Sequence, residues 1–89
     1  MIPKIVKYKK EYYVFYNTND NGRAKLIDRH GYKFSGCPEI SKLIISDIIV
    51  ETVMFNKYQY FKTKIGVFSS ATGNRIQSSD ILDLFKESV

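Results

Sequence analysis

The chain opens with two stretches, residues 4–8 and 11–17, whose β-branched and aromatic residues favour strands. They form either one strand that bends at residues 9–10 or two separate strands. Residues 17–22, NTNDNG, are rich in residues that adopt left-handed backbone conformations easily, so we expect a turn there. Residues 23–28 alternate in polarity and predict the return strand of a hairpin.

The next segment predicts shorter elements. Residues 29–31 have the composition of a second turn, and residues 32–36 that of a short third strand. A Pro-Glu pair at positions 38–39 is typical of a helix start, and residues 40–44 would supply one or two helical turns.

A β-branched run follows and predicts a strand over residues 47–55. Because a short apolar run cannot be assigned by its period alone, helix and strand both stay open for residues 40–49. Residues 56–57 lie between two β-rich runs and predict a two-residue hairpin loop. The run after the loop predicts one strand over residues 58–68.

The end of the chain predicts a turn at residues 69–74, a short strand or extended connection at 75–77, and a helix. Residues 78–80, Ser-Ser-Asp, offer side chains that cap a helix start. One broad stripe of that helix is apolar. Its members are Ile81, Leu82, Leu84 and Phe85.

These elements together predict one α+β domain over residues 1–89, with a small antiparallel sheet of about five strands in a meander and a C-terminal α-helix on one face. A chain of 89 residues is long enough for one hydrophobic core and too short for two. With the helix on one face of the sheet, we expect the opposite face to meet solvent or a partner.

Composition bears on the compartment. No apolar run approaches the roughly 20 residues of a membrane span, and the first residues lack the apolar core and cleavage site of a signal peptide. The one cysteine, Cys37, permits no internal disulfide, which fits a reducing compartment. We therefore expect a cytoplasmic protein without membrane contact.

Charge is unevenly distributed along the chain, whose formal net charge is +5. Residues 1–34 carry eight basic and three acidic residues, a balance of +5, and residues 57–75 carry four basic residues and no acid. Residues 35–56 and 76–89 each balance at −2. The basic charge therefore lies in two blocks that are both predicted to be strands, and such charge indicates partners rather than fold.

The sequence KYQYFKTK, residues 57–64, gives the strongest indication of function. Residues of equal parity on a strand share a face, so Tyr58, Tyr60, Lys62 and Lys64 are expected in one row. Rings stack on bases and ammonium groups neutralise phosphates, which are the two requirements of a single-strand nucleic-acid surface. Further candidates for this surface share the parity or add charge. They are Arg23, Lys25, Lys7, Lys9 and Lys10.

On the second predicted strand, either Tyr12 and Tyr16 or Tyr13 and Phe15 are expected to face outward. The rings and lysines also have a plainer interpretation, because Tyr is favoured on solvated strand faces and Lys on strands resists edge-to-edge pairing. Arginine is the side chain that most often reads base edges, and the chain has only three arginines. Any binding is therefore expected to follow the nucleic-acid backbone and to weaken with salt.

Candidate catalytic residues are sparse. His30 is the only histidine and is expected in a solvated turn, while Cys37 is expected as a small apolar filler. Neither has carboxylates at a metal-ligand spacing, and residues 72–74, TGN, lack the glycine spacing of a phosphate loop. We expect no enzyme activity, no metal and no cofactor.

The sequence therefore predicts a small, basic, non-enzymatic regulatory protein that binds RNA or single-stranded nucleic acid. The alternative is an inhibitor or adaptor that docks on a larger protein. The chain is rich in Lys, Ile, Asn, Tyr and Phe, whose codons are A/T-rich, which indicates an A+T-rich genome such as those of many bacteriophages and some bacteria; a phage source would suit the inhibitor or adaptor. A homodimer formed by strand addition at an unpaired edge, residues 4–8, is a further expectation.

Overall fold

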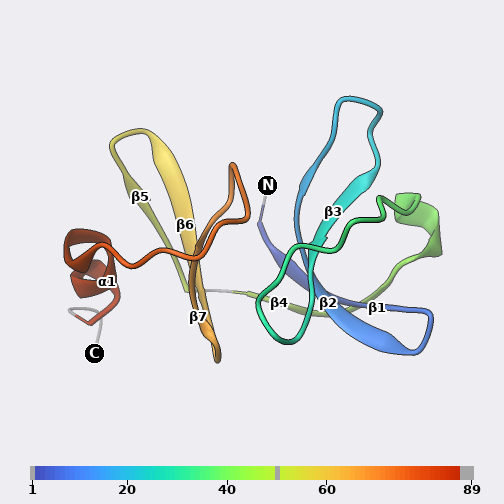
Figure 1. Ribbon diagram of the computed structural model, residues 1–89, viewed down its shortest axis with the longest axis horizontal. Coiled ribbons are helices and arrows are strands. Elements are labelled where there is room, and N and C mark those ends of the chain that lie inside the picture. Colours follow the sequence, from blue (N-terminus) through green and yellow to red (C-terminus); the bar gives the residue numbers. More distant parts are fainter. Residues whose placement is uncertain (1, 50, 87–89) are drawn as a thin grey trace.

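The structure, a computed structural model, describes residues 2–49 and 51–86. Figure 1 shows two antiparallel sheets side by side, with a helix beyond the second. The described elements are β1 (Lys4–Tyr8), β2 (Glu11–Thr18), β3 (Ala24–Ile27), the 3-10 helix η1 (Ile40–Lys42), β4 (Ile44–Ile48), β5 (Thr52–Phe55), β6 (Tyr58–Thr63), β7 (Gly66–Ser69) and α1 (Ser79–Lys86). The α+β class is confirmed, but the strands form sheets of order β3-β2-β1-β4 and β5-β6-β7 instead of a single sheet.

The first sheet contains the hairpin that the sequence predicts, β2 paired with β3, and a second hairpin, β1 with β2, precedes it. β1 and β2 are two strands rather than one bent strand, and their pairing runs up to Tyr8 opposite Glu11. Lys9 and Lys10 alone connect them, with φ angles of 49° and 69°. This pair of left-handed residues is what a two-residue hairpin turn requires, because its twist matches that of the strands.

The segment between β3 and β4 differs from the prediction. Residues 32–36 do not form a strand, since only Lys33 bridges to Ile27 at the edge of β3. The chain instead crosses the outer face of the first sheet, where Phe34 and Leu43 pack beside the buried side chains of that face. The helical start expected for residues 40–44 is reduced to the single turn of η1, and β4 follows directly.

The strand predicted over residues 47–55 is wrong as a single element. β4 ends at Ile48 in the first sheet and β5 begins at Thr52 in the second, with Val50 outside the described residues. Ile49 lies between them, and its N–H donates to the Pro3 carbonyl at 3.0 Å. The β-branched pattern cannot reveal that the chain passes from one sheet to the other here, because strands of both sheets favour the same residue types.

β4 pairs antiparallel with β1, so β1 lies inside the sheet between β2 and β4. The expectation that residues 4–8 form an unpaired edge is therefore wrong. The edge strand on this side of the sheet is β4.

The strand predicted over residues 58–68 is also two strands, β6 and β7, joined by a tight turn at residues 64–65. The Thr63 hydroxyl closes this turn: it donates to the Gly66 carbonyl and accepts the Ile65 N–H, both at 3.2 Å. The loop at residues 56–57 is confirmed, with both residues left-handed.

The C-terminal helix is confirmed and packs on one face of the second sheet. Ile81 and Phe85 are buried in a cluster with Val67, beside the half-buried Val53 and Tyr60. No helix among the described residues is long and apolar enough to cross a membrane.

The opposite face of the second sheet packs on the first sheet and forms the main core. Phe61 and Phe68 are fully buried there, with stacked rings 5.7 Å apart between centroids. They meet Val14, Tyr16 and Ile27 of the first sheet. Both faces of the second sheet are thus covered, and the expectation that one face is left to solvent or a partner is wrong.

Candidate nucleic-acid interface

The residues of the predicted row on β6 face the helix. Tyr60 lies opposite Val53 of β5, and Lys62 lies opposite Val67 of β7. Since Val53 and Val67 belong to the cluster around α1, this parity is the one that the helix covers. Tyr60 is half-buried in that cluster, while Tyr58, at the start of the strand, keeps 57% of its surface exposed. The rings and ammonium groups of β6 therefore do not form one open face.

The basic residues at the far end of β6 lie close to one another. Lys62 lines a cleft of about 410 Å³ together with Arg75, and a neighbouring cleft together with Lys64. Lys62 also forms a long ion pair, with 3.8 Å between its Nζ and Glu51 Oε2. Lys64 is exposed but belongs to the turn after β6 rather than to the strand. The structure thus keeps Lys62 near Lys64 and adds Arg75, which the sequence did not place there.

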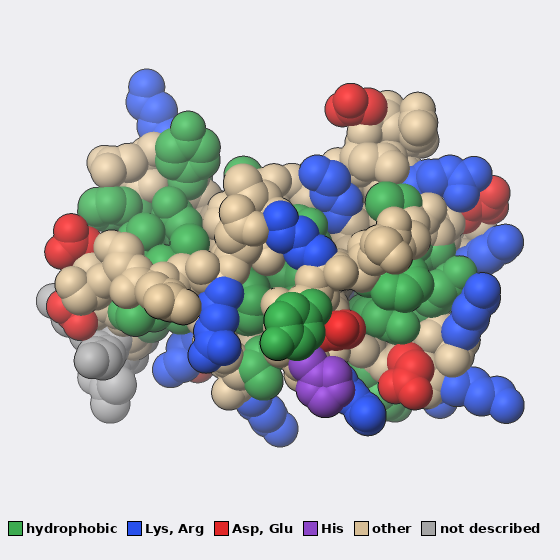
Figure 2. Space-filling model, viewed as in Figure 1, with side chains coloured by type: hydrophobic (Ala, Val, Ile, Leu, Met, Phe, Trp, Pro, Cys, Tyr) green, Lys and Arg blue, Asp and Glu red, His purple; other side chains and the backbone are tan. Residues whose placement is uncertain are grey.

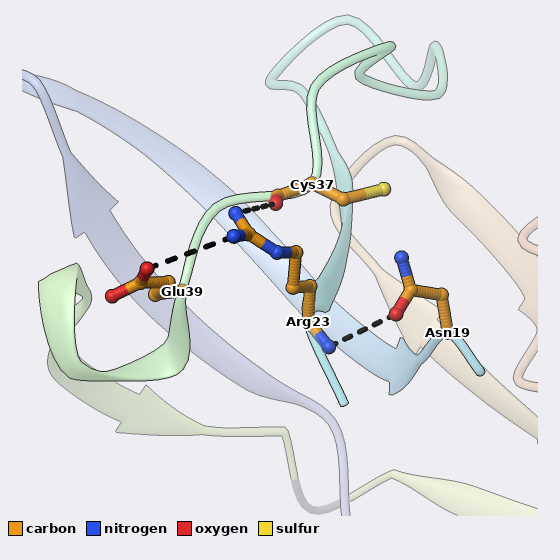
Figure 3. Close-up of polar contacts among 4 residues, drawn as sticks. All are labelled: Asn19, Arg23, Cys37 and Glu39. Carbon is orange, nitrogen blue, oxygen red and sulfur yellow. Dashed lines mark hydrogen bonds and ion pairs between the residues drawn. The ribbon is translucent and has the colours of Figure 1, made fainter. Parts of the chain in front are cut away.

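Arg23 is engaged within the first sheet's own loops (Figure 3). Its Nη1 donates to the Cys37 carbonyl at 3.4 Å, and its Nη2 lies 3.6 Å from Glu39 Oε1. Its backbone N–H donates to Asn19 Oδ1 at 3.0 Å, which closes the β2–β3 turn. These contacts tie residues 37–39 to the hairpin. The Arg23 guanidinium therefore has a structural role within the protein. Lys25 lies half-buried on β3 in the same sheet, whereas the predicted row lies on β6 of the second sheet.

The remaining predicted residues gather on the β1–β2 hairpin. Lys9 and Lys10 are exposed at its turn, and Lys7 lies opposite Tyr12 in the second residue pair before the turn. Figure 2 shows Lys and Arg side chains along the right-hand end of the molecule, where Figure 1 places this hairpin. No ion pair joins these three lysines to any acidic side chain that the structure describes.

Tyrosine rings accompany these lysines. Lys7 Nζ lies 5.7 Å from the ring centroid of Tyr12, and Lys9 Nζ lies 5.3 Å from that of Tyr8. Tyr12 is 52% exposed, and Tyr13 is half-buried beside Phe34, with ring centroids 5.0 Å apart. The combination of ring and ammonium sought on β6 is thus present on this hairpin, and the sequence signal for it is KYKKEYY, residues 7–13.

The outward pairs expected on β2 are not found as predicted. Phe15 and Tyr16 are both 4% exposed, because a covering layer lies on each face of the first sheet. Burial raises the pKa of the Tyr16 phenol above its ordinary value of 10.0, and the charge of a Cys37 thiolate nearby would raise it further. Tyr16 is accordingly a core residue and offers no ring to a ligand.

The two candidate catalytic residues, His30 and Cys37, have different partners in the contacts that the structure describes. His30 is exposed in its predicted turn, where its Nε2 lies 3.3 Å from Arg29 Nε. Cys37 is half-buried, and its carbonyl serves Arg23. Among the described residues, no group of three or more histidine, cysteine or acidic side chains has the arrangement of a metal site. Residues 69–74 form the predicted turn, with Ser69 Oγ accepting the Ala71 N–H at 3.3 Å.

Comparison with known proteins adds no family: no family model, no curated protein and no solved structure matches this chain.

Proposed function

We propose that the protein is a cytoplasmic regulator that binds RNA or another single-stranded nucleic acid through the β1–β2 hairpin. The observation that carries the proposal is the group of three exposed or half-exposed lysines, Lys7, Lys9 and Lys10, on one hairpin, with Lys7 beside the open ring of Tyr12. Together with Glu11, the acid of the same hairpin, they balance at +2. Such a surface offers cations to phosphates and a ring face to a base.

The turn itself supports a role for its lysines. Lys9 and Lys10 both have positive φ, where Asn and Gly are preferred and a long side chain is uncommon. Local rules are most often broken where residues are retained for function. The equivalent turn at residues 56–57 has asparagine at its first position, whereas this turn has lysine at both, and the doubled lysine favours a charge-dependent role for it.

The expected mode of binding follows from the side chains available. Lysine is a flexible point charge that contacts phosphate without reading a base edge. Arg23 is held by Glu39 and the Cys37 carbonyl, and the cations of the hairpin itself are all lysines. Binding is therefore expected to follow the phosphate backbone, with little sequence preference and a strong dependence on salt.

The test compares two lysines in equivalent turns. Lys10 and Lys57 are each the second residue of a two-residue left-handed turn, with φ of 69° and 72°. Affinity for a fluorescently labelled single-stranded RNA is measured by anisotropy across a salt series, for wild type, Lys10→Gln and Lys57→Gln. Lys10→Gln is expected to weaken binding and to reduce the slope of log K against log salt by about 0.7, the value for one phosphate on a single strand. Lys57→Gln is expected to bind like wild type.

Three further outcomes decide the proposal. Equal losses in Lys10→Gln and Lys57→Gln would indicate diffuse attraction to a basic protein and no hairpin site. A loss confined to Lys62→Gln/Lys64→Gln would move the site to the far end of β6. Absence of binding at low salt, where attraction to phosphates is strongest, would overturn nucleic-acid binding and direct the search to a protein partner.

A further inference from the structure

β4 is the most exposed apolar strand of the molecule as described. Ile44, Ile45 and Ile48 are 67%, 60% and 50% exposed, and every residue of the strand is exposed. β4 is also an edge, since β1 is its only neighbour among the strands that the structure describes. Natural edge strands are commonly blunted by Lys, Pro or a covering segment, because an open apolar edge invites another strand. β4 contains neither Lys nor Pro; its blunting features are one charged residue, Asp47, and a register shift in its pairing with β1.

Two other sheet edges show how this chain covers an edge. Beside β3, the Phe34 N–H donates to the Leu26 carbonyl at 2.9 Å. Beside β7, the Ile76 N–H donates to the Val67 carbonyl at 2.8 Å. Among the backbone hydrogen bonds of the described residues, none covers the outer edge of β4 in this way. The edge with the most exposed apolar side chains is thus one that the fold leaves open.

We propose that the β4 edge binds a second copy of this chain, strand against strand and antiparallel. A strand edge is self-complementary about a two-fold axis, because each copy presents the same unpaired amides and carbonyls to the other. The pairing would bury the isoleucines of both copies and join the two four-stranded sheets into one continuous sheet.

The order of charges along β4 favours a second copy of the chain as the partner and favours antiparallel pairing. Lys42 lies just before β4, and Asp47 lies near its end. Antiparallel pairing brings the Lys42 end of each strand beside the Asp47 end of the other, so opposite charges approach twice by symmetry. Parallel pairing would place like charges together. The segment from Lys42 to Ile49 is neutral overall, so two basic molecules can meet here without charge repulsion at the contact.

One outward amide of the edge is already occupied. The Ile49 N–H points toward β1, where it bonds to the Pro3 carbonyl, so the preceding N–H of Ile48 points away from β1. That N–H donates to Asp47 Oδ1 at 2.7 Å. A second strand must displace this carboxylate, and Lys42 of the second copy is the cation to which Asp47 would turn. Asp47 thus restrains the free edge and contributes to the paired one.

The first experiment measures mass in solution by sedimentation equilibrium over a range of concentrations. Wild type is expected to pass from the monomer mass of 10.4 kDa to twice that value as concentration rises. Ile45→Lys is expected to raise the dissociation constant at least about tenfold, because a lysine on an edge strand opposes pairing. Met54→Lys is the matched control, since Met54 is 66% exposed on β5 of the other sheet. It is expected to dimerise like wild type.

The second experiment exchanges the charges. Lys42→Asp and Asp47→Lys are each expected to weaken dimerisation, and the double variant to restore it, because the exchange keeps opposite charges together. A wild type that stays monomeric at millimolar concentration would overturn the proposal, and binding of a different protein at this strand would then be the explanation of its exposure. Equal effects of Ile45→Lys and Met54→Lys, or a double variant weaker than both single variants, would also overturn it.

Discussion

Gly73 lies where the turn after β7 meets the first sheet, directly against the ring of Tyr16. Its φ is +75°, and a Cβ built there would lie 2.5 Å from the Tyr16 hydroxyl oxygen. Gly73→Ala must therefore strain the backbone and also displace a buried ring. We expect it to lower the free energy of unfolding by about 2–4 kcal/mol, from the left-handed cost and from overpacking together. Urea denaturation measures this loss.

Gly22 separates the two contributions. Its φ is +76°, but a Cβ there would meet no atom within 4 Å. Gly22→Ala is expected to cost about 1–2 kcal/mol, the left-handed penalty alone. If both variants lose the same free energy, the contact between Gly73 and Tyr16 does not constrain the molecule.

Single residues also show what a sequence cannot reveal. The turn at residues 69–74 was predictable from its Ser, Thr, Gly and Asn. The need for glycine at position 73 was not, because Tyr16, from a distant part of the chain, imposes it. Arg23 is a similar case: its charge was visible in the sequence, but its contacts with Cys37 and Glu39 depend on how the chain folds back.

At the scale of elements, the two-residue turns carry a testable preference. Asn56 and Lys57 connect β5 to β6 with φ angles of 50° and 72°. Asn-Gly is the preferred pair for such a turn, since glycine adopts positive φ without steric cost. Lys57→Gly is therefore expected to raise the free energy of unfolding by about 0.5–1 kcal/mol, after the larger entropy of glycine in the unfolded chain is subtracted. Thermal and urea denaturation measure the gain.

Lys64 supplies the control for this substitution within the same sheet. It lies in the β6–β7 turn, but it is not among the residues with positive φ. Lys64→Gly is expected to leave stability unchanged or to lower it, because glycine brings only its entropic cost there. A gain in both variants would show that removal of positive charge, and not backbone conformation, stabilises the protein.

Elements marked by local chemistry were predicted well, and elements marked by distant contacts were not. The turns at residues 17–22 and 56–57 and the helix at the end of the chain follow from short-range signals. The break between β6 and β7 depends on the Thr63 side chain, whose hydroxyl bonds within the turn. The break between β4 and β5 is a passage from one sheet to the other, which a run of β-branched residues does not mark.

At the scale of the molecule, the number of sheets determines whether the predicted row on β6 is exposed. With a single sheet, the row on β6 would have had a free side opposite the helix. With two sheets, Phe61 faces the first sheet and Tyr60 faces α1, so both parities of β6 are covered. The candidate surface therefore consists of the hairpin lysines, which were predicted from the sequence only to add charge to the row on β6.

The contact between the sheets also predicts how the protein unfolds. Phe61 is fully buried between them and stacks on Phe68. Phe61→Ala is expected to cost about 3–5 kcal/mol, a large part of the roughly 4–13 kcal/mol expected for a chain of this length. Tyr58→Ala, which removes an exposed ring from the same strand, is the control and is expected to change stability little.

Hydrogen exchange then decides whether the two sheets unfold together. The main core joins Val14 and Ile27 of the first sheet to Phe61 and Phe68 of the second, so neither sheet keeps its apolar face covered without the other. Phe61→Ala is therefore expected to lower amide protection in β2 as much as in β6 and β7. If protection falls only in the second sheet, the two sheets are separate cooperative units, and the expectation of one domain over the whole chain would fail.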